Sequence, residues 1–240
     1  MGYDPKVALV HRFFSGTGSS YDYMVNLGTL GFDLWWKKRI LDKIPATAKR
    51  IVDHACGTGI LTLKIARKFP GAQVIGVELR DEYLRLAKAK TNHLGLQNVR
   101  FILGRAEDVL LREKFDCITS SYLAKYADLE TLVLNGREML RPGGVLLMHD
   151  FSYPPNHFFA TLWELYFTLA MQKIGAALFP EWSTVYYELP GMMRRTDWIH
   201  ILTKSLRENH FSDIDIEHLT FGTSTIITAR NQGRSRWVHP

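Results

Sequence analysis

Two glycines and an acid occur together in the stretch Asp-His-Ala-Cys-Gly-Thr-Gly at residues 53–59. The stretch follows the short run Arg50-Ile51-Val52 and precedes residues 60–69, whose apolar side chains recur at helical spacing. This pattern predicts a strand, a tight loop and a helix. Because glycine has no Cβ, such a loop lets the backbone approach a ligand closely. A loop at the carboxyl end of a parallel strand is a common place for a nucleotide-like ligand.

The spacing of these residues indicates the class of ligand. A dinucleotide site prefers Gly-x-Gly-x-x-Gly, but Thr62 stands where the third glycine would follow Gly57 and Gly59. Asp53 precedes the glycines, and Glu78 ends the next expected strand, where its carboxylate can accept both hydroxyls of a ribose. Together these features favour an S-adenosylmethionine site. The alternative is structural: the glycines form a turn, Asp53 caps the helix, and Glu78 lies at a solvated strand end.

The elements that must position these residues alternate between strands and helices from residue 50 onward. Strands are expected at 50–54, 73–78, 99–103, 115–121 and 144–151, and helices at 60–69, 81–94, 107–112 and 129–140. A helix at 197–209 and a hairpin of strands at 213–220 and 224–230 follow. Such alternation predicts an α/β fold with a doubly wound, Rossmann-like, seven-stranded sheet. We expect it to be mostly parallel, with an antiparallel strand at the C-terminal end.

Two segments outside this pattern are expected to form a helical cap within a single domain of residues 1–240: residues 1–45 and the aromatic-rich insertion 153–198. Residues 157–179 are about long enough to cross a membrane, but Glu164, Gln172 and Lys173 interrupt them. We therefore expect amphipathic helices that cover the site or touch a membrane surface. The aromatic residues of the insertion either pack as core or line an apolar tunnel: Trp163, Tyr166, Phe167, Phe179, Trp182, Tyr186 and Tyr187.

Composition narrows the choice of partner and compartment. The formal net charge is +6, but the lysines and arginines are scattered along the chain, so we expect no nucleic-acid partner. Only two cysteines occur, and the amino terminus lacks the pattern of a signal peptide, which favours a cytoplasmic protein, with peripheral membrane contact as an option. No group of histidines and cysteines has the spacing of a zinc site, so we expect no metal.

From about residue 13 to residue 231 the sequence resembles the class I S-adenosylmethionine-dependent methyltransferases, specifically the ubiquinone/menaquinone-biosynthesis C-methyltransferases. The matching residues are Tyr21, Asp22, Met24, Gly31, Trp36 and Lys37 near the amino terminus, and Leu140, Pro142, Gly143, Gly144, Phe151 and Ser152 further on. The resemblance implies S-adenosyl-L-methionine as the cofactor. The cofactor-binding residues are then expected to be Asp53, Ala55, Gly57, Thr58, Gly59, Glu78, Leu79, Ala106, Glu107 and Ser121.

Two departures from the family pattern bear on the ligands. The family has Gly-Asp-Ala after the third strand, where the Asp contacts the adenine amino group, but this chain has Gly104-Arg105-Ala106. We expect Glu107 or Asp108 to take over that contact. After the fourth strand the family has Phe-Gly-x-Arg-Asn, which is implicated in positioning or deprotonating the quinol ring. Residues 122–126 read Tyr-Leu-Ala-Lys-Tyr, without the Arg-Asn pair.

The chemistry at such a site is mostly a matter of positioning, because the methyl group of a sulfonium is already activated. A carbon nucleophile ortho to a phenol benefits from a base that removes the phenolic proton. The candidate catalytic residues are His149, Asp150, Tyr122, Lys125 and Tyr21, with Asp22 beside the last. The sequence does not choose among them, and for any single histidine a structural role is the commoner one.

We therefore expect methyl transfer to a small apolar aromatic acceptor, with quinols or quinol precursors as the leading class. Three alternatives stay open at this point: a methyltransferase of another small molecule in secondary metabolism, a relative that uses the sulfonium for non-methyl chemistry, and an accessory protein that binds the cofactor without methylating. A homodimer is an option for the assembly.

Overall fold

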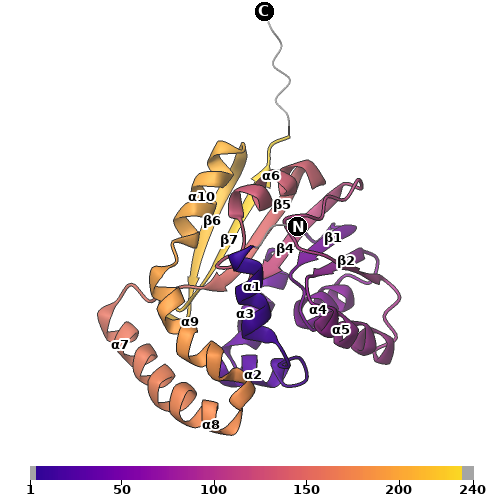
Figure 1. Ribbon diagram of the computed structural model, residues 1–240. Helices are drawn as coiled ribbons and strands as arrows, with labels where there is room; N and C mark the ends of the chain where they lie inside the picture. Colours follow the sequence, from indigo (N-terminus) through magenta and orange to yellow (C-terminus); the bar gives the residue numbers. More distant parts are fainter. Residues whose placement is uncertain (1–3, 234–240) are drawn as a thin grey trace, which may run out of the picture.

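The computed structural model of the protein describes residues 4–233, which fold around one seven-stranded sheet (Figure 1). The strands are β1 Arg50–His54, β2 Gln73–Glu78, β3 Val99–Leu103, β4 Phe115–Ser121, β5 Leu140–Phe151, β6 Phe211–Leu219 and β7 Ser224–Asn231. Their order in the sheet is β3-β2-β1-β4-β5-β7-β6. Strand β7 is antiparallel to both β5 and β6, whereas the other neighbouring pairs are parallel. The predicted fold class is confirmed.

Several expectations for the elements differ in the structure, and strand β6 begins at Phe211 rather than at residue 213. Strand β5 begins at Leu140 rather than at residue 144, because Leu140 pairs with Phe115 before the register shifts over the Pro-Gly-Gly turn. The helix expected at 107–112 is wrong, since these residues form turns and irregular backbone. So short a helix cannot offset its nucleation cost, and the Glu107 carbonyl instead accepts a hydrogen bond from Asn135 Nδ2 at 2.6 Å.

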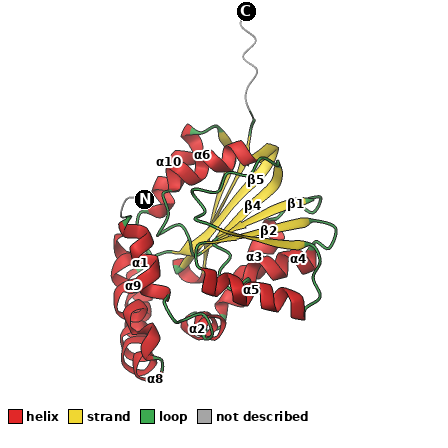
Figure 2. Cartoon of the chain, turned by 45° about the vertical axis from the view of Figure 1, so that its right-hand side comes forward, coloured by secondary structure: helices red, strands yellow, loops and turns green. Residues whose placement is uncertain are grey.

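Helices cover both faces of the sheet because neighbouring strand residues point to opposite sides (Figure 2). On one face, Ile51 packs in a cluster with α3 (Phe32–Lys43) and α4 (Ile60–Lys68). On the other, Val52 packs in a cluster with α6 (Leu129–Met139) and α10 (Trp198–Glu208). Helix α5 (Asp81–His93) contacts β2 and β3. Helix α3, although part of the segment expected to form a cap, therefore belongs to the layer on the sheet.

A third cluster of buried side chains joins helices from both ends of the chain. It draws on α1 (Pro5–Phe14), α2 (Tyr21–Gly28), a π-helix (Phe167–Gly175), a 3₁₀ turn (Pro180–Trp182) and α9 (Ser183–Arg195). Together with α7 (His157–Tyr166) and α8 (Ala176–Leu178), which lie low in Figure 1, we call these the outer helices. Arg12 of α1 donates to both carboxylate oxygens of Glu188 in α9, at 2.6 and 2.5 Å. Within residues 4–233, no helix is both long and apolar enough to cross a membrane.

Candidate active site

Two adjoining cavities lie between the sheet and the outer helices. The larger has a volume of about 160 Å³ and the smaller about 30 Å³. Both are bordered by Tyr21, Ala55, Gly57, Ser121 and Tyr122, so they share a wall at the ends of β1 and β4. Of the residues expected in the cofactor site, Glu78, Leu79, Ala106 and Glu107 also line the larger cavity.

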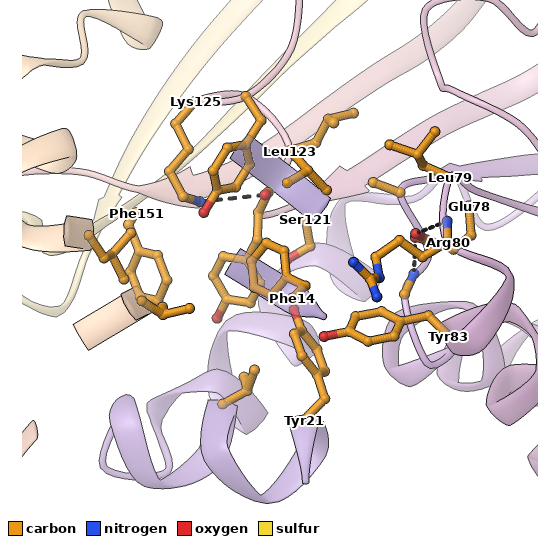
Figure 3. A pocket seen from close by; sticks show the side chains of 18 of the residues that line it. Phe14, Tyr21, Glu78, Leu79, Arg80, Tyr83, Ser121, Leu123, Lys125 and Phe151 are labelled. Atoms are coloured by element: carbon orange, nitrogen blue, oxygen red, sulfur yellow. Dashed lines mark hydrogen bonds between the residues drawn. The ribbon is translucent and has the colours of Figure 1, made fainter. Parts of the chain in front are cut away.

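Glu78 holds the glycine loop in place. Its carboxylate accepts hydrogen bonds from the backbone N–H of Gly57 at 2.9 Å and from that of Arg80 at 2.8 Å, as Figure 3 shows. Burial raises the pKa of Glu78, although both N–H groups act in the opposite direction. The loop needs its glycines because Gly57 and Gly59 have φ of 58° and 87°, in the left-handed region. A Cβ on Gly59 would also lie 3.2 Å from the Ala87 Cβ.

Asp53 and Thr58 support this loop rather than line the larger cavity. Asp53 accepts hydrogen bonds from the hydroxyls of Thr62 at 2.6 Å and Thr119 at 2.9 Å, and borders the smaller cavity. Burial raises the pKa of Asp53 to about 6. Thr58 donates to Asp22 Oδ1 at 2.5 Å, which ties the loop to α2. Thr62, in the third glycine position, thus supplies a hydrogen-bond donor to the buried Asp53 carboxylate.

Arg105 does not present an acceptor for an adenine amino group. Its guanidinium lies 2.6 Å from Asp4 Oδ2 and 3.2 Å from Glu107 Oε1. Glu107 is buried and lines the larger cavity, whereas Asp108 is exposed and does not. This chain lacks the Asp that the family has after the third strand. Of the two acids that could replace it, the structure therefore places Glu107 at the cavity.

Lys125, which follows β4, forms a buried ion pair with Asp150 of β5. Both side chains are at most 2% exposed. The ammonium lies 4.7 Å from the ring centroid of Tyr126, 5.5 Å from that of Tyr122 and 5.3 Å from that of Phe151. Burial lowers the pKa of Lys125, and Asp150 opposes that shift. Lys125 lines the larger cavity, whereas Asp150 lines neither cavity.

A second buried network lies beneath this pair. Lys37 donates to Asp33 Oδ1 at 2.8 Å and to Ser121 Oγ at 2.7 Å. Ser121 Oγ lies 2.8 Å from His149 Nδ1, and His149 Nε2 lies 2.6 Å from Ser224 Oγ. Burial and the two lysines hold the pKa of His149 well below its usual value, so the ring is neutral. Although His149 is one of the candidate catalytic residues, it lines neither cavity.

The two tyrosine candidates are buried phenols that keep their protons. Burial raises the pKa of Tyr21 and that of Tyr122 well above the usual value. The Tyr122 hydroxyl donates to Asp33 Oδ1 at 2.6 Å. Tyr21 lines both cavities, and its ring packs 5.1 Å from Tyr83 and 5.8 Å from Trp182, measured between centroids. Neither phenol can act as a base in its folded surroundings near neutral pH.

Sequence reasoning missed several residues at the cavity. Arg80 and Tyr83 follow Glu78 and enter the cavity from the start of α5, and Phe14 enters from α1 (Figure 3). Closeness to the end of β2 was the available signal for Arg80 and Tyr83. Lys37 was noted only as a matching residue of the family pattern, because nothing in the sequence places an amino-terminal helix beside β4.

Comparison with known proteins identifies relatives of this chain. A model of the ubiE/COQ5 methyltransferase family matches residues 3–231. The demethylmenaquinone methyltransferase of Thermus thermophilus is 30% identical over 216 residues, covering 89% of this chain and 97% of that protein. The ubiquinone/menaquinone biosynthesis C-methyltransferase UbiE of Blochmanniella pennsylvanica is 27% identical over 231 residues, covering 94% and 91%.

Solved structures share the fold at low sequence identity. A Methanococcus maripaludis protein assigned as an S-adenosyl-L-methionine-dependent methyltransferase aligns with a TM-score of 0.65 at 14% identity, covering 91% of this chain and 94% of that one. The N-methyltransferase NodS of Bradyrhizobium japonicum, solved with S-adenosylhomocysteine, gives 0.57 at 14% identity, covering 83% and 87%. By the family match, this chain belongs to the ubiE/COQ5 methyltransferase family and is an S-adenosylmethionine-dependent methyltransferase.

Proposed function

We propose that this methyltransferase methylates an apolar, hydroxylated aromatic acceptor of the quinol class, a quinol or a quinol precursor. The observation that carries the proposal is that the larger cavity has charged residues on two opposite sides and an apolar lining from the outer helices. Glu78 and Arg80 lie across it from Lys125 and Phe151 (Figure 3). The outer helices contribute the apolar lining residues Met24, Phe167, Met171, Trp182, Val185 and Leu189.

The residues on the Glu78 side fit S-adenosylmethionine. Each Glu78 oxygen accepts one backbone N–H, and a carboxylate offers about four acceptor positions, so two are left for ribose hydroxyls. Leu79 and Ala106 supply apolar surface for the adenine, and Glu107 supplies an acceptor for its amino group. When bound, the cofactor supplies an electrophilic methyl group on a sulfonium.

The outer helices would form the cap that holds the acceptor. Their aromatic and aliphatic side chains pack into one buried cluster but still leave the cavity beside Tyr21 and Phe151. An apolar chamber with a few convergent polar groups is the usual form of a small-molecule site. A ring with an apolar tail matches a chamber of this composition.

Lys125 is the residue best placed to act on the acceptor ring. Its ammonium donates to Asp150 and, at 3.4 Å, to the Tyr122 carbonyl. An ammonium has three donors, so one can bind a ring oxygen in the cavity. In this buried position the positive charge stabilises a phenolate, so the phenolic proton can leave to solvent and the ring carbon becomes more nucleophilic. Asp150 keeps the ammonium charged and oriented.

Residues 122–126, which lack the family's Arg-Asn pair, support a second candidate, a methyltransferase of another small aromatic molecule. Lysine lacks the planar fork of arginine and cannot reproduce its bidentate contact. Tyr126 offers one hydroxyl in place of an amide, and its buried ring packs against Phe13 and Phe14. A demethylmenaquinol ring would then be held less well than in the family, or in another orientation.

Complementation of a strain that cannot methylate quinones separates the two candidates. Cellular quinones are measured by mass spectrometry, and purified protein is incubated in parallel with reduced naphthoquinols and S-adenosylmethionine. Restoration of the methylated quinone supports the quinol acceptor. Failure by a soluble, cofactor-binding protein would favour a different acceptor or a different use of the sulfonium.

A lipid-like acceptor also suggests peripheral contact with a membrane. The outer helices and the start of α3 expose many apolar side chains: Tyr23, Leu30, Phe32, Leu34, Trp35, Phe158, Leu162, Leu165, Ile174 and Leu178. Helix α2 touches this region, because Tyr166 Oη donates to the Leu27 carbonyl at 2.9 Å. Phe158→Asp/Leu162→Asp should reduce co-sedimentation with phosphatidylcholine–phosphatidylglycerol vesicles, whereas Leu94→Asp, just after the end of α5, should not. Equal co-sedimentation of the two variants would contradict this contact with a membrane.

A further inference from the structure

The larger cavity has too little room for an acceptor that carries a long apolar tail. Its volume of about 160 Å³ holds roughly 10 to 16 water-sized groups. The adenosine of the cofactor and the ring of the acceptor already fill such a space. A long tail on that ring therefore has to pass out of the cavity, which is partly open to solvent.

Gly28 is the smallest residue in the wall that α2 gives to this cavity. It is the last residue of α2, and Met171 of the π-helix lines the cavity beside it. A Cβ on Gly28 would have the Met171 sulfur as its nearest neighbour, at 3.9 Å, which is ordinary van der Waals contact. The φ of Gly28 is not in the left-handed region, so the backbone does not require a glycine here. A larger side chain would extend into the space between α2 and the π-helix.

The outside of this wall is apolar. Leu27 and Leu30, on either side of Gly28 in the sequence, are 36% and 65% exposed. Leu169, on the same π-helix as Met171, is 45% exposed. An apolar tail that crosses the wall here would meet apolar surface, and covering that surface is favourable.

The side of the cavity that α1 covers is polar by comparison. Lys6 and Arg105 line it. The Lys6 ammonium donates to the Ala127 carbonyl at 2.7 Å, and the Arg105 guanidinium lies 2.6 Å from Asp4 Oδ2. A tail that left on this side would break these contacts and take charged groups out of water, which is costly.

We infer that the apolar tail of the acceptor leaves the larger cavity between Gly28 and Met171 and lies on the exposed leucines outside. Gly28 is then a specificity-determining residue, because the missing side chain sets the length of tail that the enzyme accepts. The inference rests on the proposed acceptor, a quinol or quinol precursor. It also explains how a ring could reach the cavity while its tail stays in a membrane that touches the outer helices.

The test fills the space beside Met171 with the variant Gly28→Leu. Gly191→Leu is the matched control, because Gly191 lies within α9, has no left-handed φ and lines neither cavity. A Cβ there would lie 3.6 Å from the nearest atom, a nitrogen of the Arg195 side chain. Leucine has a higher helix propensity than glycine, so both variants should fold, and equal affinity for S-adenosylhomocysteine checks this.

Methyl transfer from S-adenosylmethionine is measured with two reduced naphthoquinols, one with a single prenyl unit and one with a long polyprenyl chain. Gly28→Leu should lower kcat/KM for the long-tailed acceptor roughly ten- to a hundredfold relative to the short-tailed one, the range for an overpacked contact. Gly191→Leu should leave the ratio of the two kcat/KM values unchanged. Adding Met171→Ala to Gly28→Leu should restore part of the loss, because it reopens the same space.

An unchanged ratio in Gly28→Leu, or an equal loss with both acceptors, would overturn this route for the tail while leaving the proposed function in place. The absence of any restoration by Met171→Ala, in a double variant that still binds S-adenosylhomocysteine, would also count against it. If the unaltered protein methylates neither naphthoquinol, the proposed acceptor class fails, and the inferred route fails with it.

Discussion

Replacement of Glu78 by glutamine probes the cofactor site most directly. In the protein the two carboxylate oxygens accept the N–H groups of Gly57 and Arg80, at 2.9 and 2.8 Å. A glutamine keeps one acceptor oxygen and turns its NH₂ group toward one of these N–H donors. The variant therefore cannot hold both loop segments and both ribose hydroxyls at once.

The expected loss of binding follows from the charge of the lost acceptor. A hydrogen bond to a charged group contributes about 1.5–3 kcal/mol, so Glu78→Gln should weaken the binding of S-adenosylhomocysteine roughly 10- to 150-fold. The binding of methylthioadenosine, which has the same adenosine and thioether but a methyl group in place of the amino-acid arm, should weaken by a similar factor, because both ligands carry the ribose.

Isothermal titration of both ligands measures these losses. Glu113→Gln is the matched control, because the Glu113 side chain is 40% exposed, forms an ion pair with the surface residue Arg100 and lies outside both cavities. An unsatisfied buried N–H costs about 1–3 kcal/mol, so the melting temperature should also fall, by about 2–4 °C for each kcal/mol. Unchanged affinity for both ligands in a folded Glu78→Gln protein would refute the assignment of Glu78 to the ribose.

Three further outcomes follow from the same geometry. Lys125→Met/Asp150→Asn should lower the methylation rate about 10²–10³-fold with unchanged S-adenosylhomocysteine affinity by titration; an unchanged rate would exclude a role for Lys125 at the acceptor. Asp53, an expected cofactor-binding residue, has a pKa of about 6, so its carboxylate becomes protonated as the pH drops from 7.5 to 5.5 and no longer attracts an ammonium. The affinity for S-adenosylhomocysteine, which carries an ammonium, should therefore fall, whereas that for methylthioadenosine, which lacks the group, should not. Parallel pH curves for the two ligands would contradict a contact between Asp53 and the ammonium. Val185→Trp should fill the apolar chamber and raise KM for the acceptor, measured by steady-state kinetics, while cofactor affinity stays constant; an unchanged KM would place the acceptor elsewhere.

The sequence by itself determined the features that depend on local chemistry. The order of strands and helices followed from apolar periodicity and turn residues, because each element's pattern lies within a few neighbouring residues. The glycine loop and the acid ending β2 were recognisable for the same reason. The short helix expected at 107–112 failed where a long-range contact decided the backbone: Asn135, 28 residues away, binds the Glu107 carbonyl.

The tertiary structure alone decided which polar side chains meet and which face the cavity. His149 and Asp150 adjoin on β5, so their side chains point to opposite faces, but only packing shows that both end in closed networks. The contact of Lys37 with Ser121 spans 84 residues, and no local pattern encodes it. The neutral state of His149 and the ion pair of Lys125 with Asp150 likewise depend on burial and on neighbours that only the fold brings together.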